Sequence, residues 1–328
     1  MHHPGDIMRF FSTLLIAICA LSSTAYAQSD AYPSRPVKVI VPLTPGSGAD
    51  QAGRIVTKAL SELWKQPVVI ENRPGAGGLI GTGAVVQSAP DGYTLLIQSA
   101  SYAANPAIYK KLPYDPVKGM VDINNIGFTP YVLVTGLPGP YSSLKDLIGV
   151  AKSRTGGLPF ASAGVGSSTH LAAEFFNQTA GIQMVHVPYK GSPEAIQGTI
   201  MGDTAFYMAP ESTVLTQIRA GRVKALGVSS RSRSTQLPDV PTIADQGYPN
   251  FEIGLWFGVW APAGTPEAIV QKINADINRV LQLPDVKSQY ERLGISIRPM
   301  AQPEFARFVR EEVVKYTRIA KTAQIEPQ

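Results

Sequence analysis

The chain has 328 residues, of which 44% are hydrophobic and 16% are charged. This balance excludes a disordered polyelectrolyte. Past the N-terminal region no run of 18 apolar residues occurs, which excludes a bundle of membrane-spanning helices. The formal charge is +5, from 29 basic and 24 acidic residues that are scattered along the sequence. A nucleic-acid-binding protein usually has its basic residues clustered on one face, so we expect no nucleic acid among the partners.

The N-terminal region has the order of a cleavable secretory signal. Arg9 precedes an apolar run over residues 10–18, and Ala25-Tyr26-Ala27 follows as a small-residue cleavage site. We place the cut after Ala27, so that residues 1–27 form the signal peptide. The only cysteine, Cys19, lies inside this leader. The mature chain is therefore expected to fold without disulfides or cysteine metal ligands.

Strand and helix patterns alternate through the first part of the mature chain. A buried strand is predicted over residues 37–43, followed by a turn over 44–48. Apolar residues from Ala52 to Trp64 then recur at i, i+3, i+4, i+7, the spacing of an amphipathic helix. Further strands are predicted over 68–70 and 94–98, with a second helix between them after the glycines at 75–78. This order predicts a parallel sheet with helices on its faces.

The same alternation continues to the C-terminus. We predict strands over 132–135, 158–162, 184–187, 205–208 and 223–228, and helices over 144–152, after 164–169, from Ser192, from Thr265 and over 303–319. No change in composition marks a linker, which favours two α/β lobes joined by strands that cross between them. We expect lobe 1 to contain residues 28–128 and 253–328, and lobe 2 residues 129–252.

Two strand-to-helix loops are unusually rich in glycine and serine. The first spans residues 44–50, in which Ser47 and Asp50 have the spacing of a capping box. The second spans residues 164–170. Small residues let backbone N–H groups approach a ligand, and the helix dipole favours an anion there. Such turns also arise for structural reasons alone, but one in each expected lobe favours a binding site in the cleft between them.

Other site chemistries fit the sequence less well. The Gly46-Ser47-Gly48 turn has Gln51 where a dinucleotide fingerprint needs its third glycine, and no P-loop or G-x-S-x-G elbow occurs. His170 and His186 are the only histidines of the mature chain; both are interpreted as structural, and they make no recognisable metal set. Glu211 could face the cleft, although a single carboxylate there is more often solvated.

Many short motifs in one order resemble a known family, the periplasmic receptors of tripartite tricarboxylate transporters (the Bug-type or TctC-type solute-binding proteins). The resemblance runs along nearly the whole mature chain. It is carried by Tyr32-Pro33, Arg35-Pro36-Val37, Glu71-Asn72-Arg73-Pro74-Gly75-Ala76-Gly77-Gly78, Pro90-Asp91-Gly92-Tyr93-Thr94-Leu95-Leu96, Leu112-Pro113-Tyr114-Asp115-Pro116, His170-Leu171-Ala172-Ala173-Glu174, His186-Val187-Pro188-Tyr189-Lys190-Gly191, Leu237-Pro238-Asp239-Val240-Pro241-Thr242 and Ala261-Pro262-Ala263-Gly264-Thr265-Pro266.

The resemblance implies an α/β, two-lobed periplasmic-binding-protein fold of the Venus flytrap type, located in the periplasm. It implies a monomeric receptor, not an enzyme, that captures a small organic carboxylate without a cofactor and delivers it to the permease subunits of a tripartite tricarboxylate transporter. In such receptors backbone amides and small hydroxyls hold a ligand carboxylate. The corresponding residues here are Leu43, Thr44, Pro45, Gly46, Ser47, Gly48, Asp50, Ser99, Ala100, Ser101, Gly164, Gly166, Ser167, Ser168, Thr169, His170 and Ala209.

The sequence departs from the family pattern at three of these positions. The family often has an aromatic residue where Leu43 stands, a second glycine where Ser47 stands, and an aspartate where Ala209 stands. An aspartate there could pair with a ligand amino group, so its absence favours di- or tricarboxylates, aliphatic or aromatic, over amino acids. We expect binding without a metal ion or an arginine clamp. The alternative that stays open is an exported hydrolase or isomerase that uses His170 or Glu211.

Overall fold

The computed structural model describes residues 32–327. By internal contacts the chain divides into Met1–Ser34 and Arg35–Gln328, and the architecture below is that of the second unit. The predicted signal peptide lies outside the described residues. Within residues 32–327, no helix combines the length and the apolar character that a membrane crossing requires.

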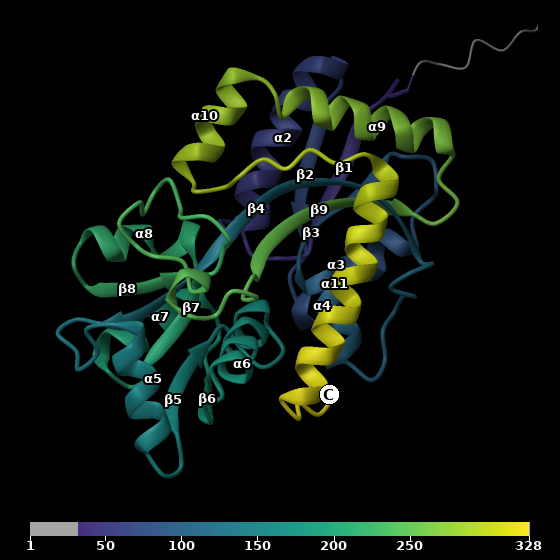
Figure 1. Cartoon of the computed structure of the whole chain (residues 1–328). Coiled ribbons are helices and arrows are strands. Elements are labelled where there is room, and N and C mark those ends of the chain that lie inside the picture. The colour runs from purple at the N-terminus through teal and green to yellow at the C-terminus, as the bar shows by residue number, and fades with distance from the viewer. Residues whose placement is uncertain (1–31, 328) are drawn as a thin grey trace, which may run out of the picture. The chain divides into compact units, whose positions relative to one another are not determined.

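Nine strands form one continuous, mixed sheet (Figure 1). The strand order is β2-β1-β3-β9-β4-β7-β5-β6, and β8 pairs with β4 beside this path. The strands are β1 (Val37–Val41), β2 (Val68–Asn72), β3 (Thr94–Ser99), β4 (Met120–Gly136), β5 (Leu158–Ser162), β6 (Met184–Pro188), β7 (Phe206–Pro210), β8 (Val223–Val228) and β9 (Gly254–Pro262).

Two parallel groups of strands are joined by two antiparallel strands. β1 pairs in parallel with β2 and β3, and β5 pairs in parallel with β6 and β7. Between the groups, the 17-residue strand β4 pairs with β9 over Met120 to Pro130 and with β7 and β8 beyond it. The predicted crossing at 129 falls inside β4, and the one at 252 lies two residues before β9. The division into lobes at these residues stays a prediction.

Helices connect the strands and cover the sheet. They are α2 (Gly48–Trp64), α3 (Leu79–Val86), α4 (Ser101–Ile108), α5 (Leu144–Ser153), α6 (Ser168–Ala180), α7 (Ser192–Met201), α8 (Glu211–Arg219), α9 (Glu267–Val280), α10 (Pro284–Arg292) and α11 (Gln302–Thr322), with 3₁₀ turns η1 (Ala76–Gly78) and η2 (Ala244–Gln246). The helix predicted from Ala52 to Trp64 is confirmed as α2, which buries Ala52, Val56, Ala59 and Leu60 along one stripe.

The C-terminal helix α11 packs against α4 and α6 (Figure 1). Trp256 of β9 donates from Nε1 to the Glu312 carboxylate of α11 at 2.9 Å, and Trp260 donates to Asp122 at 2.7 Å. Both indoles are buried, and each polar edge has a partner, as buried tryptophans require. Farther along α11, Gln178 of α6 donates to the carbonyl of Ile319 at 3.0 Å. The helix is thus bonded both to β9 and to α6.

The structure corrects several predicted elements. The sheet is mixed, because β4 and β9 run antiparallel to their neighbours, whereas a parallel sheet was expected. β4 is far longer than the predicted strand at 132–135, and β9, α4, α8 and α10 were not predicted. Ser192 is not the cap of α7; Gly191 occupies that position. The remaining predicted strands and helices are present, with ends shifted by a few residues.

Candidate functional site

A cavity of about 670 Å³ lies at the carboxyl ends of the six parallel strands. In open α/β sheets ligands bind at this end, where loops lead into helix N-termini. Loops after β1, β2, β3, β5, β6 and β7 contribute to the wall together with β9. The lining residues are 42–49, Pro74, Gly75, Gly77, Gly78, Ser99, Ser101, Asn105, Tyr109, Ala163, 165–169, 190–193, Ile196, Gln197, Ile200, Pro210, Ser212, Thr213, Gln217, Leu255 and Phe257.

The loop after β1 is braced from behind by a buried carboxylate. Ser47 is the N-cap of α2 and accepts from the amide of Asp50 at 3.4 Å, while Asp50 accepts from the amide of Gly46 at 2.9 Å. The bond from the Asp50 amide to Ser47 is the first half of the predicted capping box. The second half is absent, because the Ser47 amide donates to the carbonyl of Thr44 at 3.1 Å and Asp50 accepts from the residue before the N-cap instead. Burial would raise the pKa of Asp50, but hydrogen bonds from Arg54, Gly46 and Asn72 outweigh it and lower the pKa below its ordinary value. Asp50 is therefore ionised, and it does not line the cavity.

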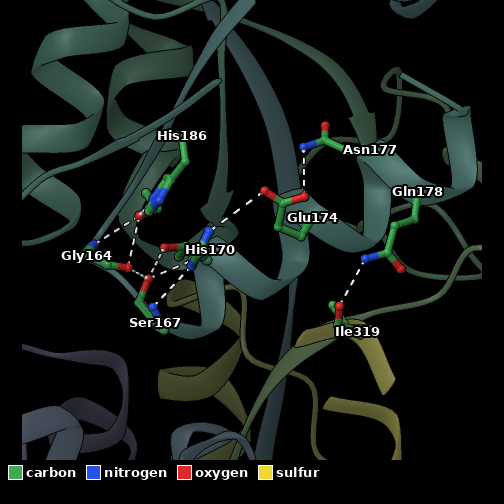
Figure 2. A network of polar contacts seen from close by, with 11 residues as sticks. Gly164, Ser167, His170, Glu174, Asn177, Gln178, His186 and Ile319 are labelled. Carbon is green, nitrogen blue, oxygen red and sulfur yellow. Dashed lines mark hydrogen bonds and ion pairs between the residues drawn. The ribbon is translucent and has the colours of Figure 1, made fainter. Parts of the chain in front are cut away.

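The loop after β5 has the same design (Figure 2). Ser167 is the N-cap of α6; its hydroxyl accepts from the amide of His170 at 3.2 Å and donates to the carbonyl of Gly164 at 2.7 Å. His170 then reaches back, and its Nδ1 accepts from the amide of Gly166 at 3.1 Å. Gly166 has φ +71°, and a Cβ there would lie 2.2 Å from the Ile108 side chain of α4. Only glycine fits this position.

Each of the two caps leaves a pair of backbone donors unused. The first-turn amides of an α-helix have no intrahelical acceptor. Within the described part of the chain, no acceptor takes the N–H groups of Gly48 and Ala49 in α2, or of Ser168 and Thr169 in α6. All four residues line the cavity. Two helix N-termini from opposite parallel groups thus present free donors and positive dipole ends to one space.

His170 and His186 stack behind the α6 loop (Figure 2). Their ring centroids are 3.7 Å apart with an interplanar angle of 9°, and Nε2 of His186 lies 2.6 Å from the Ser162 hydroxyl. Burial, with a smaller effect from His186, lowers the pKa of His170 to about 3, and burial lowers the pKa of His186 to about 4. Both imidazoles are therefore neutral at physiological pH. Neither lines the cavity, which agrees with the structural role predicted for His186. His170 was also among the predicted ligand contacts, and for this residue a contact with the ligand stays a prediction.

Most of the other predicted site residues also line this cavity. Leu43, Thr44, Pro45, Ser99 and Ser101 all contribute to its wall, and the hydroxyls of the two serines are 3.2 Å apart. The structure places the others behind the wall. Ala100 and Ala209 are fully buried, Ala209 within the core beside β4, and Gly164 does not contribute to the lining. Contact of any of these residues with a ligand stays a prediction.

Sequence reasoning missed a second group of lining residues. Asn105 and Tyr109 follow β3, Lys190 and Gln197 follow β6, and Ser212, Thr213 and Gln217 follow β7. Lys190 is the only charged residue among all that line the cavity in the described chain. The motif Tyr189-Lys190-Gly191 was visible in the sequence, but no local pattern indicated that it faced the same space as Ser47. Asn105 and the α8 residues belong to helices that were not predicted.

Glu211 lies in a different cavity, of about 380 Å³, which it lines together with Arg233, Lys287 and Arg298. It is 1% exposed, and its Oε2 has no hydrogen-bond partner within residues 32–327. Burial raises the pKa of Glu211, an effect only partly opposed by Ser234 and Arg219. The expectation that this carboxylate could face the main cavity is therefore wrong. Among the described residues, no group of three or more histidine, cysteine or acidic side chains could hold a metal ion.

The family model for the tripartite tricarboxylate transporter family receptor matches residues 52–325. The chain belongs to this receptor family. It is 36% identical to protein BugT of Bordetella pertussis over 319 residues, which cover 96% of this chain and 98% of BugT. The family relationship accounts for the shared sequence motifs along the chain.

Solved structures show that this receptor has the two-lobed periplasmic-binding-protein fold. The periplasmic binding protein BugD matches with a TM-score of 0.80 at 30% identity, covering 90% of this chain and 100% of BugD. A protein of R. palustris with adipate matches with a TM-score of 0.83 at 30% identity, covering 90% and 100% of the two chains. MatC from Rhodopseudomonas palustris with bound malate matches with a TM-score of 0.78 at 32% identity, covering 88% and 100%. As a member of this family, the receptor belongs in the periplasm.

Proposed function

We propose that this receptor captures a small organic carboxylate in the 670 Å³ cavity and delivers it to the permease of a tripartite tricarboxylate transporter. The observation that carries the proposal is the pair of unused first-turn amides at each of two facing helix starts, Gly48 and Ala49 in α2 and Ser168 and Thr169 in α6. A carboxylate has two oxygens with several lone pairs, and such donors satisfy them.

The strength of such a site is sufficient for a receptor. A hydrogen bond to a charged group contributes about 1.5–3 kcal/mol, and micromolar binding corresponds to about 8 kcal/mol. Four amides, with the Thr44 and Ser101 hydroxyls on the same wall, can supply this without a metal or a buried arginine. The loops that carry the amides are held by Asp50 and His170, so little ordering is required when the ligand binds.

Two solved relatives support the ligand class. The R. palustris protein was solved with adipate and MatC with malate, and both compounds are dicarboxylates. The same cavity residues of this chain are neutral apart from Lys190, and none is acidic. A cationic or zwitterionic ligand would find no counter-charge for its ammonium group there. We therefore infer that anionic carboxylates, and not amino acids, are the ligands.

Two half-sites on separate lobes are best satisfied together when the lobes close, so the ligand should favour the closed state. The lobes proposed are residues 28–128 with 253–328, and 129–252. The protein acts in this scheme as a monomer.

A thermal-shift screen against mono-, di- and tricarboxylates tests the proposal, with calorimetry on every compound that raises the melting temperature. We expect at least one carboxylate to bind at micromolar strength, with no turnover of the bound compound. Small-angle scattering should show a smaller radius of gyration with that ligand. If no carboxylate binds, or if a bound one is chemically converted, the receptor function proposed here is wrong.

A further inference from the structure

Lys190 stands out among the residues of the main cavity because its side chain alone is charged there. It is exposed, and within residues 32–327 its Nζ has no ion-pair partner. The nearest acid along the chain, Glu194, uses its carboxylate on the backbone instead, accepting from the amide of Lys190 at 3.2 Å. The cavity wall therefore carries one positive charge that no residue of the wall neutralises.

The backbone of Lys190 is fixed beside the α6 loop. The amide of Tyr189 donates to the carbonyl of Ser162 at 3.0 Å, which extends the pairing of β6 with β5 to the edge of the cavity. The Tyr189 ring packs on α7, where a Cβ on Gly198 would lie 2.1 Å from its hydroxyl. A Cβ on Gly164 would lie 3.4 Å from the carbonyl oxygen of Tyr189. Lys190 thus follows a residue that lies beside the start of the loop leading into α6.

We propose that Lys190 is the counter-ion for a second carboxylate of the ligand and makes this a receptor for dicarboxylate dianions. The inference rests on the proposed function. The free amides of α2 and α6 can satisfy one carboxylate with neutral donors, which leaves the lysine available for a second one. A ligand with a second carboxylate at its other end matches both features. It neutralises the lysine and leaves no charge unpaired when the cleft closes.

The test is calorimetry with two probes of equal chain length, adipate and hexanoate, on the wild-type protein, Lys190→Gln, Lys190→Arg and the control Lys152→Gln. Lys152 is exposed on α5 and does not line the cavity, so its substitution removes the same charge elsewhere. We expect Lys190→Gln to weaken adipate binding roughly tenfold, the effect of an ion pair of about 1.4 kcal/mol. Hexanoate binding should stay unchanged, Lys190→Arg should retain most of the preference, and Lys152→Gln should match the wild type.

A salt series adds an independent readout. Adipate affinity of the wild-type protein should fall as ionic strength rises, and that fall should be shallower in Lys190→Gln, because screening acts on the lysine and not on fixed dipoles. Equal losses for adipate and hexanoate, or no loss for either, would overturn the role of Lys190 while carboxylate capture stands. Absence of binding by either probe and by every other carboxylate in the wild-type protein would overturn both proposals.

Discussion

Acidification from pH 7 to pH 5 should destabilise the ligand-free receptor through the stacked pair His170 and His186. In the folded state both are neutral at pH 5, because their pKa values are depressed to about 3 and about 4. In the unfolded chain an ordinary histidine has a pKa of about 6.5. The unfolded state therefore binds more protons below pH 6.5. Stability falls as the pH drops through this range and continues to fall until the folded-state pKa values are reached.

The magnitude follows from this linkage. With an unfolded pKa of about 6.5, each histidine costs about 2 kcal/mol at pH 5, and the pair costs about 4 kcal/mol. This figure depends little on the folded pKa values, since both lie below 5. Asp122 acts in the opposite direction, because burial raises its pKa to about 6 and the folded state takes up its proton first. The contribution of the two histidines to the pH dependence of stability is therefore measured by comparing variants, and not from the wild-type curve alone.

The assay is urea unfolding at pH 7 and pH 5 of the wild type, of the single variants His170→Gln and His186→Gln, and of the double variant. The stability lost between the two pH values should be about 4 kcal/mol smaller in the double variant and about 2 kcal/mol smaller in each single variant. Glu174 is the acidic group that could stabilise a protonated His170, since its Oε1 lies 3.8 Å from Nε2 of His170. That distance is too long for a hydrogen bond, and burial raises the pKa of Glu174 itself. An identical pH dependence in all four proteins would show that the folded imidazoles are protonated.

Two further predictions concern the cap of α6 and the buried carboxyl of Glu211. Ser167→Ala should lower the stability by about 1 kcal/mol and weaken carboxylate binding severalfold. The control is Ser143→Ala, which removes the matching cap of α5 outside the cavity. It should cost similar stability and leave the affinity measured by calorimetry unchanged. Equal affinities in both variants would mean that the α6 loop does not hold the ligand. Glu211→Gln should raise the free energy of unfolding in urea at pH 7 but not at pH 4. The reason is that the pKa of Glu211 is raised in the folded protein, so the wild type loses stability as the pH rises above the pKa that this carboxyl has in the unfolded chain. A variant less stable than the wild type at pH 7 would refute this.

Elements with a strong local pattern were predictable from sequence. β5 was predicted at its observed bounds because turn residues flank a short apolar run, and the periodicity of α2 fixed its buried face. β4 was mostly missed, because buried polar residues such as Asn124, Asn125 and Thr129 interrupt its apolar pattern. α4 carries Pro106 and is buried on nearly all sides, so it lacks the polar face that marks a helix. In both segments tertiary contacts decide the structure.

The candidate site was predictable only in part, for a related reason. Glycine, serine and a following helix indicated the loops at 44–50 and 164–170, and both line the cavity. Within those loops, Asp50 and His170 were predicted to contact the ligand. In the structure, the side chain of each accepts a hydrogen bond from an amide of its own loop. Lys190 carried no local signal, because what places it in the cavity is the pairing of β6 with β5.

In each loop some amides are bonded to a buried side chain and others are free for a ligand, and this difference affects ligand specificity. Asp50 and His170 occupy the amides of Gly46 and Gly166, and the following amides of Ser47 and Ser167 donate to the carbonyls of Thr44 and Gly164. The amides free for a ligand are those of the first helical residues after them. Such donors recognise a carboxylate but do not distinguish one carboxylate from another. Discrimination must then come from the rest of the wall, where Lys190, Gln197, Ser212 and Gln217 project from helices and loops that do not brace the amides. Substitutions there can change the preferred ligand while the carboxylate cradle and its buried supports stay intact.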